Sequence, residues 1–260
     1  MPTRLRVNLA GYHHVINRGV NRCNVFEHKN DKEMFLQIIN KTAIIHKIIL
    51  HDYCLMDNHY HLLIETQKEN ISTFMRIVNA NYAKYFNKRY KRSGHLWQDR
   101  YKSKYIISDE YLYTLIRYIE YNPVEAGLTQ EVGEYPFTFT HNIFKGSDYY
   151  FCSKESILLK QFDLETLNEF LEAAISDKEI AYLKEKEKQK IEKSEQGITM
   201  RRSKMFEEHF YDVTTKLDRN LAILNAYLDG YTQVDIANYL KVSKSLISKV
   251  IKSGDSFTGV

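Results

Sequence analysis

Apolar side chains along the first half of the chain follow two different periods, which predicts β-strands mixed with amphipathic helices. The alternating segment Tyr12–Asn17 predicts a strand, and residues 51–65 predict two more, separated at the turn-forming pair Asp57-Asn58. Alternation returns at Tyr101–Ile107, where a fourth strand is expected. Short strands separated by helical segments are typical of an α+β domain.

Three amphipathic helices are expected in the same region. Asp31–Leu50 and Ser72–Arg89 carry apolar residues at a spacing close to 3.6, which places those side chains on one side of a helix. A third helix is expected at Asp109–Tyr121. We expect it to stop near Asn122, because Pro123 disfavours helical geometry in the residue before it.

The second half of the chain shows no strand pattern after Gln161. Residues 178–196 are rich in charges of both signs, which is typical of an exposed helix or of a linker between domains. We therefore expect an α+β domain at residues 1–150, a helical, charged linker region at residues 151–200, and an all-α domain at residues 201–260.

Composition bears on the partners, the cysteine chemistry and the cellular location of the protein. The net charge of +4 is mildly basic, which by itself is weak support for a nucleic-acid partner. The cysteines Cys23, Cys54 and Cys152 are odd in number and form no C-x-x-C pair, which disfavours a disulfide framework or a cysteine zinc site. The sequence shows neither an apolar run of membrane-spanning length nor a secretory signal, so we expect a cytoplasmic protein with no membrane partner.

His59 and His61 are the candidate metal ligands. On a strand, residues two apart point to the same face, so both imidazoles would project together while Tyr60 points the other way. Two imidazoles on a rigid strand make half of a divalent-metal site. Such pairs also arise by chance, and the alternative is two strand histidines with no ligand.

Tyr118 is the candidate nucleophile. It lies four residues before Asn122, so both side chains would share one face of the third helix. A tyrosine hydroxyl can attack a phosphodiester, but its pKa near 10 means that it needs help from a metal or a base. The alternative is that Tyr118 only packs, as most tyrosines on amphipathic helices do, and Tyr121 is a second choice of nucleophile.

Four sequence blocks carry a resemblance to a known family. Met56–Leu63, MDNHYHLL, resembles the histidine-hydrophobic-histidine (HUH) motif of IS200-like transposases. Gly94–Lys102, GHLWQDRYK, and Arg117–Leu128, RYIEYNPVEAGL, resemble blocks of the REP-associated tyrosine transposase branch. Tyr12–Gly19, YHHVINRG, looks like the first strand of that branch. The resemblance covers about residues 8–145, and four blocks in order are more specific than one.

The resemblance implies a ferredoxin-like domain, with an antiparallel sheet and helices on one face, that nicks and religates single-stranded or hairpin DNA. By this carry-over His59 and His61 would hold Mg²⁺ or Mn²⁺, and Asn122 would be the third ligand or its neighbour. Tyr118 would form a 5′-phosphotyrosine that a later 3′-hydroxyl reverses, without a nucleotide cofactor. Tyr60 departs from the aliphatic residue that is frequent in the family, which should be tolerated because this side chain is expected to face the core.

A basic stretch with interleaved aromatic residues is the candidate DNA-binding surface. Cations suit phosphates and flat rings suit unpaired bases, although a solvated helix face followed by a core tryptophan is the alternative. The residues are Lys84, Lys88, Arg89, Arg92, Trp97, Arg100, Lys102 and Lys104.

The segment Leu221–Ile251 resembles a helix-turn-helix. Its last helix presents polar residues suited to the major groove of duplex DNA, namely Lys244, Ser245, Ser248 and Lys249. The alternative is a small helical bundle that binds protein.

Three functions remain open at this point. The first is a metal-dependent transposase that acts as a monomer or a homodimer. The second is a domesticated regulator that binds DNA without catalysis, which the intact His59, His61, Tyr118 and Asn122 disfavour. The third is a metal-dependent hydrolase that forms no covalent intermediate.

Overall fold

The protein is described by a computed structural model that covers residues 8–106, 108–146, 150–173, 175–188, 190–194, 197–201, 207–211, 213–228 and 231–254. The chain divides into two compact units, Met1–Leu183 and Lys184–Val260. In the part of the chain so described, no helix combines the length and the apolar character needed to cross a membrane.

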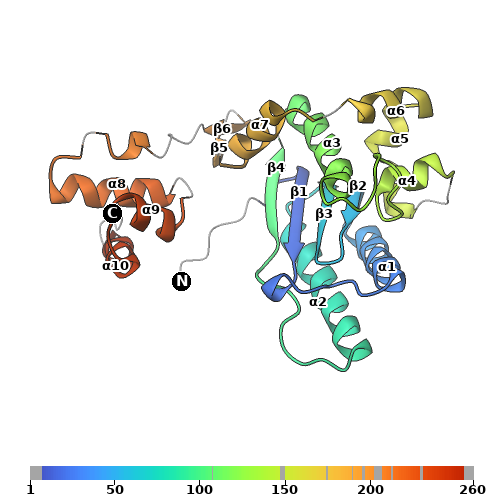
Figure 1. Cartoon of the computed structure of the whole chain (residues 1–260), viewed down its shortest axis with the longest axis horizontal. Helices are drawn as coiled ribbons and strands as arrows, with labels where there is room; N and C mark the ends of the chain where they lie inside the picture. The colour runs from blue at the N-terminus through green and yellow to red at the C-terminus, as the bar shows by residue number, and fades with distance from the viewer. Residues whose placement is uncertain are drawn as a thin grey trace. The chain divides into compact units, whose positions relative to one another are not determined.

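The first unit is built on a four-stranded antiparallel sheet in the order β2-β3-β1-β4 (Figure 1). The strands are β1 (Gly11–Arg18), β2 (Ile48–Leu55), β3 (His59–Thr66) and β4 (Lys102–Ile106). Helix α1 (Lys29–His46) connects β1 to β2, and α2 (Ile71–Arg89) connects β3 to β4. This β-α-β-β-α-β order is the ferredoxin-like topology that the sequence predicted.

Helices α1 and α2 cover one face of the sheet, and an aromatic core joins the two layers. Tyr60 of β3 points into this core and is fully buried. Its ring lies 4.8 Å from Phe35 of α1 and 5.6 Å from Trp97, measured between centroids. Its hydroxyl donates to Asn79 Oδ1 of α2 at 2.9 Å. The expectation that Tyr60 faces the core is confirmed.

Helix α1 ends before its expected limit at Leu50. Lys47 takes a left-handed conformation with φ 54°, and β2 begins at the next residue. The apolar run that followed the helix therefore belongs to the sheet. A short apolar segment of this kind reads equally well as helix or buried strand, and pairing with β3 decides between them.

Helix α3 (Asp109–Glu125) lies on the other face of the sheet (Figure 1). The expected stop near Asn122 is wrong, because α3 continues through Pro123 to Glu125. Asn122 explains the continuation: its Nδ2 donates to the carbonyl oxygens of Tyr118 at 2.6 Å and Ile119 at 3.4 Å. The Ile119 carbonyl is the acceptor that the nitrogen of Pro123 cannot serve, so the side chain replaces part of the lost backbone bond.

Residues 151–183 pack on the first unit, which corrects the linker expected from residue 151 onward. Short helices α4 (Phe139–Phe144), α5 (Ile157–Gln161) and α6 (Leu164–Glu172) follow α3. Ser156 Oγ donates to the carbonyl of His51 at 2.7 Å, and Leu158 and Leu167 are buried. The sequence does not predict this packing, because helices as short as α4, α5 and α6 have too few apolar residues to show a clear period.

The remaining elements are α7 (Asp177–Lys188), a hairpin of β5 (Lys190–Ser194) and β6 (Gly197–Arg201), and three helices. The hairpin corrects the expectation of helix alone between residues 151 and 200. Alternating charges around β-branched Ile191, Ile198 and Thr199 suit strands as well as an exposed helix.

The C-terminal helices α8 (Lys216–Leu228), α9 (Gln233–Tyr239) and α10 (Lys244–Gly254) share a core of their own. Ile236 and Ala237 of α9 meet Ile223 of α8 and Ile247 of α10 in this core. The turn between α9 and α10 is tight: Lys241 has φ 52°, and Val242 N–H donates to Ala237 O at 3.0 Å. The last described part of the chain is therefore a small three-helix unit with a tight turn between α9 and α10.

Candidate active site

Strand β3 presents two histidines on the face that α3 covers. Residues of a strand alternate between faces, so His59 and His61 point away from the buried Tyr60. The two imidazole rings are 5.2 Å apart between centroids. We call this side the histidine face and the side under α1 and α2 the aromatic face.

His61 is held by a third histidine that the sequence analysis did not select. His14 of β1 stacks on His61 with centroids 5.2 Å apart, and its Nε2 lies 2.9 Å from His61 Nδ1. When His61 donates from Nδ1, its Nε2 keeps the lone pair that a metal requires. His14 sits two residues from Ile16, the direct cross-strand partner of His61. The YHH sequence by itself predicts only a strand, and the register of β1 on β3 brings His14 to His61.

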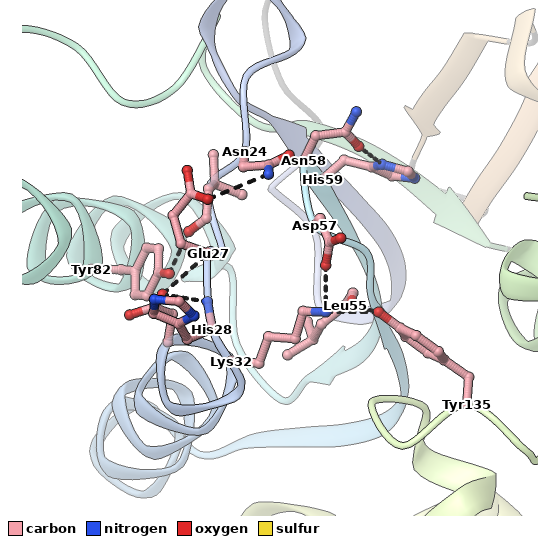
Figure 2. A network of polar contacts seen from close by, with 12 residues as sticks. Asn24, Glu27, His28, Lys32, Leu55, Asp57, Asn58, His59, Tyr82 and Tyr135 are labelled. Carbon is pink, nitrogen blue, oxygen red and sulfur yellow. Dashed lines mark hydrogen bonds and ion pairs between the residues drawn. The ribbon is translucent and has the colours of Figure 1, made fainter. Parts of the chain in front are cut away.

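The imidazole of His59 is oriented by the side chain of its neighbour, Asn58. Its Nδ1 lies 2.6 Å from Asn58 Oδ1, an atom that can only accept, so the hydrogen sits on Nδ1 and Nε2 is the lone-pair nitrogen (Figure 2). Gly19 N–H donates to Asn58 O at 2.9 Å, which ties the end of β1 to this turn. A β-carbon on Gly19 would collide with the carbonyl oxygen of Cys23, so glycine is required there.

A buried lysine holds the turn that precedes His59. Lys32 Nζ of α1 lies 2.7 Å from Asp57 Oδ1 and 2.7 Å from the hydroxyl of Tyr135, which itself donates to Leu55 O (Figure 2). The lysine side chain is 7% exposed and Asp57 is 57% exposed. No local sequence signal marks this contact, because its three members are far apart in the chain.

The three histidines are neutral at physiological pH. Burial lowers the pKa of His14 to about 3, with the charge of Lys104 adding to the effect. Burial, His14 and His59 lower the pKa of His61 well below its usual value. Burial and then Arg18 lower the pKa of His59. Neutral imidazoles are the form that binds metal ions.

Tyr118 of α3 reaches the histidine face. Its ring packs edge-on against His61 with centroids 5.8 Å apart, and the residue is half-buried. Tyr121, the second choice, is also half-buried. The structure therefore brings the rings of Tyr118 and His61 into contact.

Asn122 is buried one turn beyond Tyr118, with 8% of its surface exposed. Since its Nδ2 serves helix carbonyls, Oδ1 is the atom that could ligate a metal. Among the residues that the structure describes, no group of three or more His, Cys, Asp or Glu side chains could hold an ion. His59 and His61 could supply two nitrogen ligands to a metal, and its remaining ligands would have to be amide, water or phosphate oxygens.

A buried carboxyl pair fixes α3 to the sheet. Asp52 of β2 and Glu120 of α3 are both buried and lie close enough to affect each other's ionisation, which favours one proton shared by the two carboxyl groups. Glu120 also accepts from the backbone N–H of Thr140 at 3.1 Å and from its hydroxyl. Burial, followed by the charge of Glu120, raises the pKa of Asp52 well above its usual range. This pair holds the helix that carries Tyr118.

The predicted basic stretch is divided between the two faces. Lys102 and Lys104 of β4 pair with Ile16 and His14 of β1, so they lie on the histidine face. Lys84, Lys88, Arg89 and Arg92 lie on or just after α2, on the other side of the sheet. The sequence placed all of them in one groove, and the alternation of β4 separates them.

Two of these cations are engaged within the protein. Arg89 Nε lies 3.3 Å from the buried carboxylate of Asp31, which also accepts from the hydroxyls of Tyr85 and Tyr90. The guanidinium of Arg92 lies over Phe86, 5.4 Å from the ring centroid. Lys84 and Lys88 are exposed. On α10, Lys244, Ser245 and Lys249 are exposed, and Ser248 is half-buried.

Comparison with known proteins agrees with the motifs. Residues 8–122 match the family described as "Transposase IS200 like". The predicted resemblance is confirmed. The match runs from β1 to Asn122 of α3 and includes His59, His61 and Tyr118.

A protein of Haemophilus influenzae is similar to part of the chain. A Haemophilus influenzae protein described as a REP-associated tyrosine transposase is 29% identical over 108 residues, which cover 37% of this chain and 61% of that protein. The chain therefore spans less than two thirds of the length of this relative.

Two solved structures are similar to the chain. One is a REP-associated tyrosine transposase bound to a REP hairpin, with 19% identity and a TM-score of 0.47 over 58% of this chain and 90% of that one. The other, from Deinococcus radiodurans and described as a transposase, has 20% identity and a TM-score of 0.33 over 46% and 95%.

Proposed function

We propose that the protein is a single-tyrosine transposase that nicks and religates single-stranded DNA at the histidine face. The contact between the rings of Tyr118 and His61, 5.8 Å apart, carries the proposal. It places a hydroxyl-bearing side chain beside a neutral imidazole on a rigid strand. The IS200-like match over the same residues supports the chemistry.

The proposed reaction exchanges one phosphodiester for another. The Tyr118 hydroxyl oxygen attacks the scissile phosphorus and loses its proton to solvent, while the bond to the 3′-oxygen breaks and that oxygen gains a proton. A 5′-phosphotyrosine results, and a 3′-hydroxyl reverses the step with the same balance. Bond energy is kept throughout, so no nucleotide cofactor is needed.

The residues of the histidine face have separate roles in this proposal. Mg²⁺ or Mn²⁺, held by Nε2 of His59 and His61 and by Asn122 Oδ1, would polarise the scissile phosphate. His14 keeps His61 in the ligating tautomer. Lys102 and Lys104 flank this face on the edge strand and attract the DNA backbone.

Hairpin DNA is the proposed substrate class. The solved relative carries a REP hairpin, as its description states. In this chain the cations of the edge strand β4 offer phosphate contacts beside the proposed cleavage site, and the exposed lysines of α2 offer further contacts on the opposite face of the sheet.

The C-terminal helices are proposed to bind duplex DNA. Lys244, Ser245 and Lys249 are exposed on α10, the helix that follows the tight turn after α9. A second helix in this position reads the major groove in helix-turn-helix proteins. This unit would bring the enzyme to DNA that the first unit cuts.

The decisive experiment is one incubation of the full chain with a labelled hairpin oligonucleotide and Mn²⁺. We expect a covalent protein–DNA adduct that survives denaturing electrophoresis, and Tyr118→Phe should reduce it below detection. Tyr121→Phe is the matched control, since Tyr121 lies on the same helix, and should leave the adduct. A wild-type protein that binds the hairpin without forming an adduct would instead be a regulator, and cutting without an adduct would identify a hydrolase.

A further inference from the structure

A cavity opens on the aromatic face, between α2 and the segment 94–101. Its volume is about 990 Å³, which is within the range of pockets that enclose a small organic ligand. Asn17, at the end of β1, forms part of its wall and is the cross-strand partner of Tyr60. The cavity therefore lies across the sheet from His61. Its wall also includes Arg76, Asn79, Ala80, Trp97, Asp99 and Arg100.

Asn17 presents a hydrogen-bond donor that meets no acceptor among the residues that the structure describes. The residue is 5% exposed, and its Oδ1 accepts from the N–H of Arg18 at 3.0 Å. Because a backbone N–H can only donate, this bond fixes the orientation of the amide. Nδ2 is then the second polar atom, and it is buried without a partner within the described structure. Buried donors of this kind are rare, and this one calls for an acceptor from a ligand.

Asn79 adds a second oriented amide to the same wall. Its Oδ1 accepts from the hydroxyl of Tyr60 at 2.9 Å, so Nδ2 is again the donor. Its backbone oxygen accepts from Nε1 of Trp97 at 3.0 Å. Both bonds are made inside the protein, so these groups are set before any ligand arrives.

Trp97 supplies a rigid flat surface. Tyr60 and Tyr82 pack against its indole at centroid distances of 5.6 and 5.9 Å, and the residue is only half-buried. Opposite it, the small side chain of Ala80 leaves room on α2. A flat ring facing open space is the surface on which a nucleobase stacks.

The charges around the cavity suit a nucleotide. Arg76 and Arg100 are exposed on its two sides, and Asp99 is the acidic residue in the wall. Arg100 lies two residues before Lys102, the first residue of β4, and Lys102 faces the other side of the sheet. A DNA backbone that passes around this edge strand would meet cations on both faces.

We propose that this cavity binds one unstacked nucleobase of the DNA strand, with Trp97 as the stacking surface and Asn17 and Asn79 as donors to its carbonyl oxygens or ring nitrogens. The inference rests on the proposed function, because it takes DNA as the ligand. The bound base is separate from the scissile nucleotide, since Asn17 and His61 point to opposite faces of the sheet. Holding this base would set the position of the strand relative to Tyr118.

The single tryptophan of the chain makes the test direct, because Trp97 is its only indole. The full-length protein is titrated with a single-stranded oligodeoxynucleotide of about 12 nucleotides, within the site sizes common for such proteins. A second oligonucleotide has the same phosphates but abasic sugars. We expect the first to quench Trp97 fluorescence and the abasic one to leave it unchanged at equal occupancy, with occupancy measured by anisotropy of an end label.

Ala80→Phe should fill the cavity without disturbing the core, because Ala80 is exposed on α2. We expect the affinity for the normal oligonucleotide to fall roughly 5- to 100-fold, the range expected for losing one stacked base. Asn81→Phe is the matched control: it adds the same ring at the next exposed position, outside the cavity wall, and should change neither affinity nor adduct formation.

Equal quenching by the abasic strand, or equal affinities of the Ala80→Phe and Asn81→Phe variants, would overturn the base pocket. If the wild-type protein forms its covalent adduct while Trp97 stays unquenched, this inference fails and the proposed function stands. If quenching is base-dependent but no adduct forms, the pocket stands and the proposed chemistry fails.

Discussion

Tyr60 and His61 are neighbours on β3, yet their environments have opposite character. Tyr60 lies in a core of aromatic rings under α1 and α2, where its one polar atom is satisfied by Asn79. His61 lies between His14 and Tyr118 under α3, among polar groups that can exchange protons or bind ions. A single strand thus supplies a packing face and a chemical face, because its side chains alternate.

The comparison shows that packing on one face of β3 holds the histidines on its other face in place. Packing on the aromatic face holds β3 in position. The imidazoles of His59 and His61 project from this strand on the histidine face, so their directions are set as well. Helix α3 is the only one of the first three helices on the chemical side, and the Asp52–Glu120 pair holds it there. Each of the following changes tests one part of this division.

Removing a ligand should have the largest effect. We expect His61→Ala and His59→Ala each to lower metal-dependent adduct formation by at least about a hundredfold, because the two imidazoles act as a unit. Excess EDTA on the wild-type protein should do the same. Adduct formation that continues unchanged in EDTA would contradict the metal role.

Substitution of His14 tests whether metal binding depends on the orientation that His14 gives to His61. We expect His14→Ala to weaken metal binding by about 10- to 100-fold, the range seen when a residue that orients a ligand is lost. His14→Gln keeps a side-chain oxygen that can accept from His61 Nδ1 and should restore part of the affinity. The readout is the Mn²⁺ concentration that gives half-maximal adduct, and a shift in melting temperature without a shift in that concentration would point to packing alone.

Asp52 tests how α3 is held. Its folded pKa is raised, so the proton it carries stabilises the fold at low pH, and this stability is lost as pH rises from the ordinary aspartate value toward the folded one. In that window the free energy of unfolding should fall by up to about 1.4 kcal/mol per pH unit for this one proton. Asp52→Asn should flatten that slope in urea unfolding measured at several pH values. Equal slopes for both proteins would show that the pair does not titrate on folding.

Lys88 and Arg89 test whether the rim of α2 binds DNA at all. Lys88→Ala should reduce the slope of log affinity against log salt by about 0.7, the value for one phosphate contact on a single DNA strand. Arg89→Ala should change the slope less, because Asp31 already balances that charge. A slope that both variants leave unchanged would restrict DNA binding on this unit to β4 and the histidine face.

The sequence by itself determined the local elements and the main chemical candidates. Alternation placed His59 and His61 together and sent Tyr60 to the core, and the turn at Asp57-Asn58 separated β2 from β3, as the structure shows. The motifs identified the IS200-like region, and the spacing of Tyr118 and Asn122 put both on one helix. All of these features depend on residues close in the chain, where period and turn chemistry act directly.

Only the tertiary structure decided which distant residues meet. Strand register brings His14 to His61, and packing brings Lys32 to Asp57 and Asp52 to Glu120. No local pattern reports such contacts. The same register divided Lys102 and Lys104 from the lysines of α2, and packing drew residues 151–183 onto the first unit. Register and packing depend on the whole sheet and its helices at once, whereas a sequence pattern reports only the face on which each residue lies.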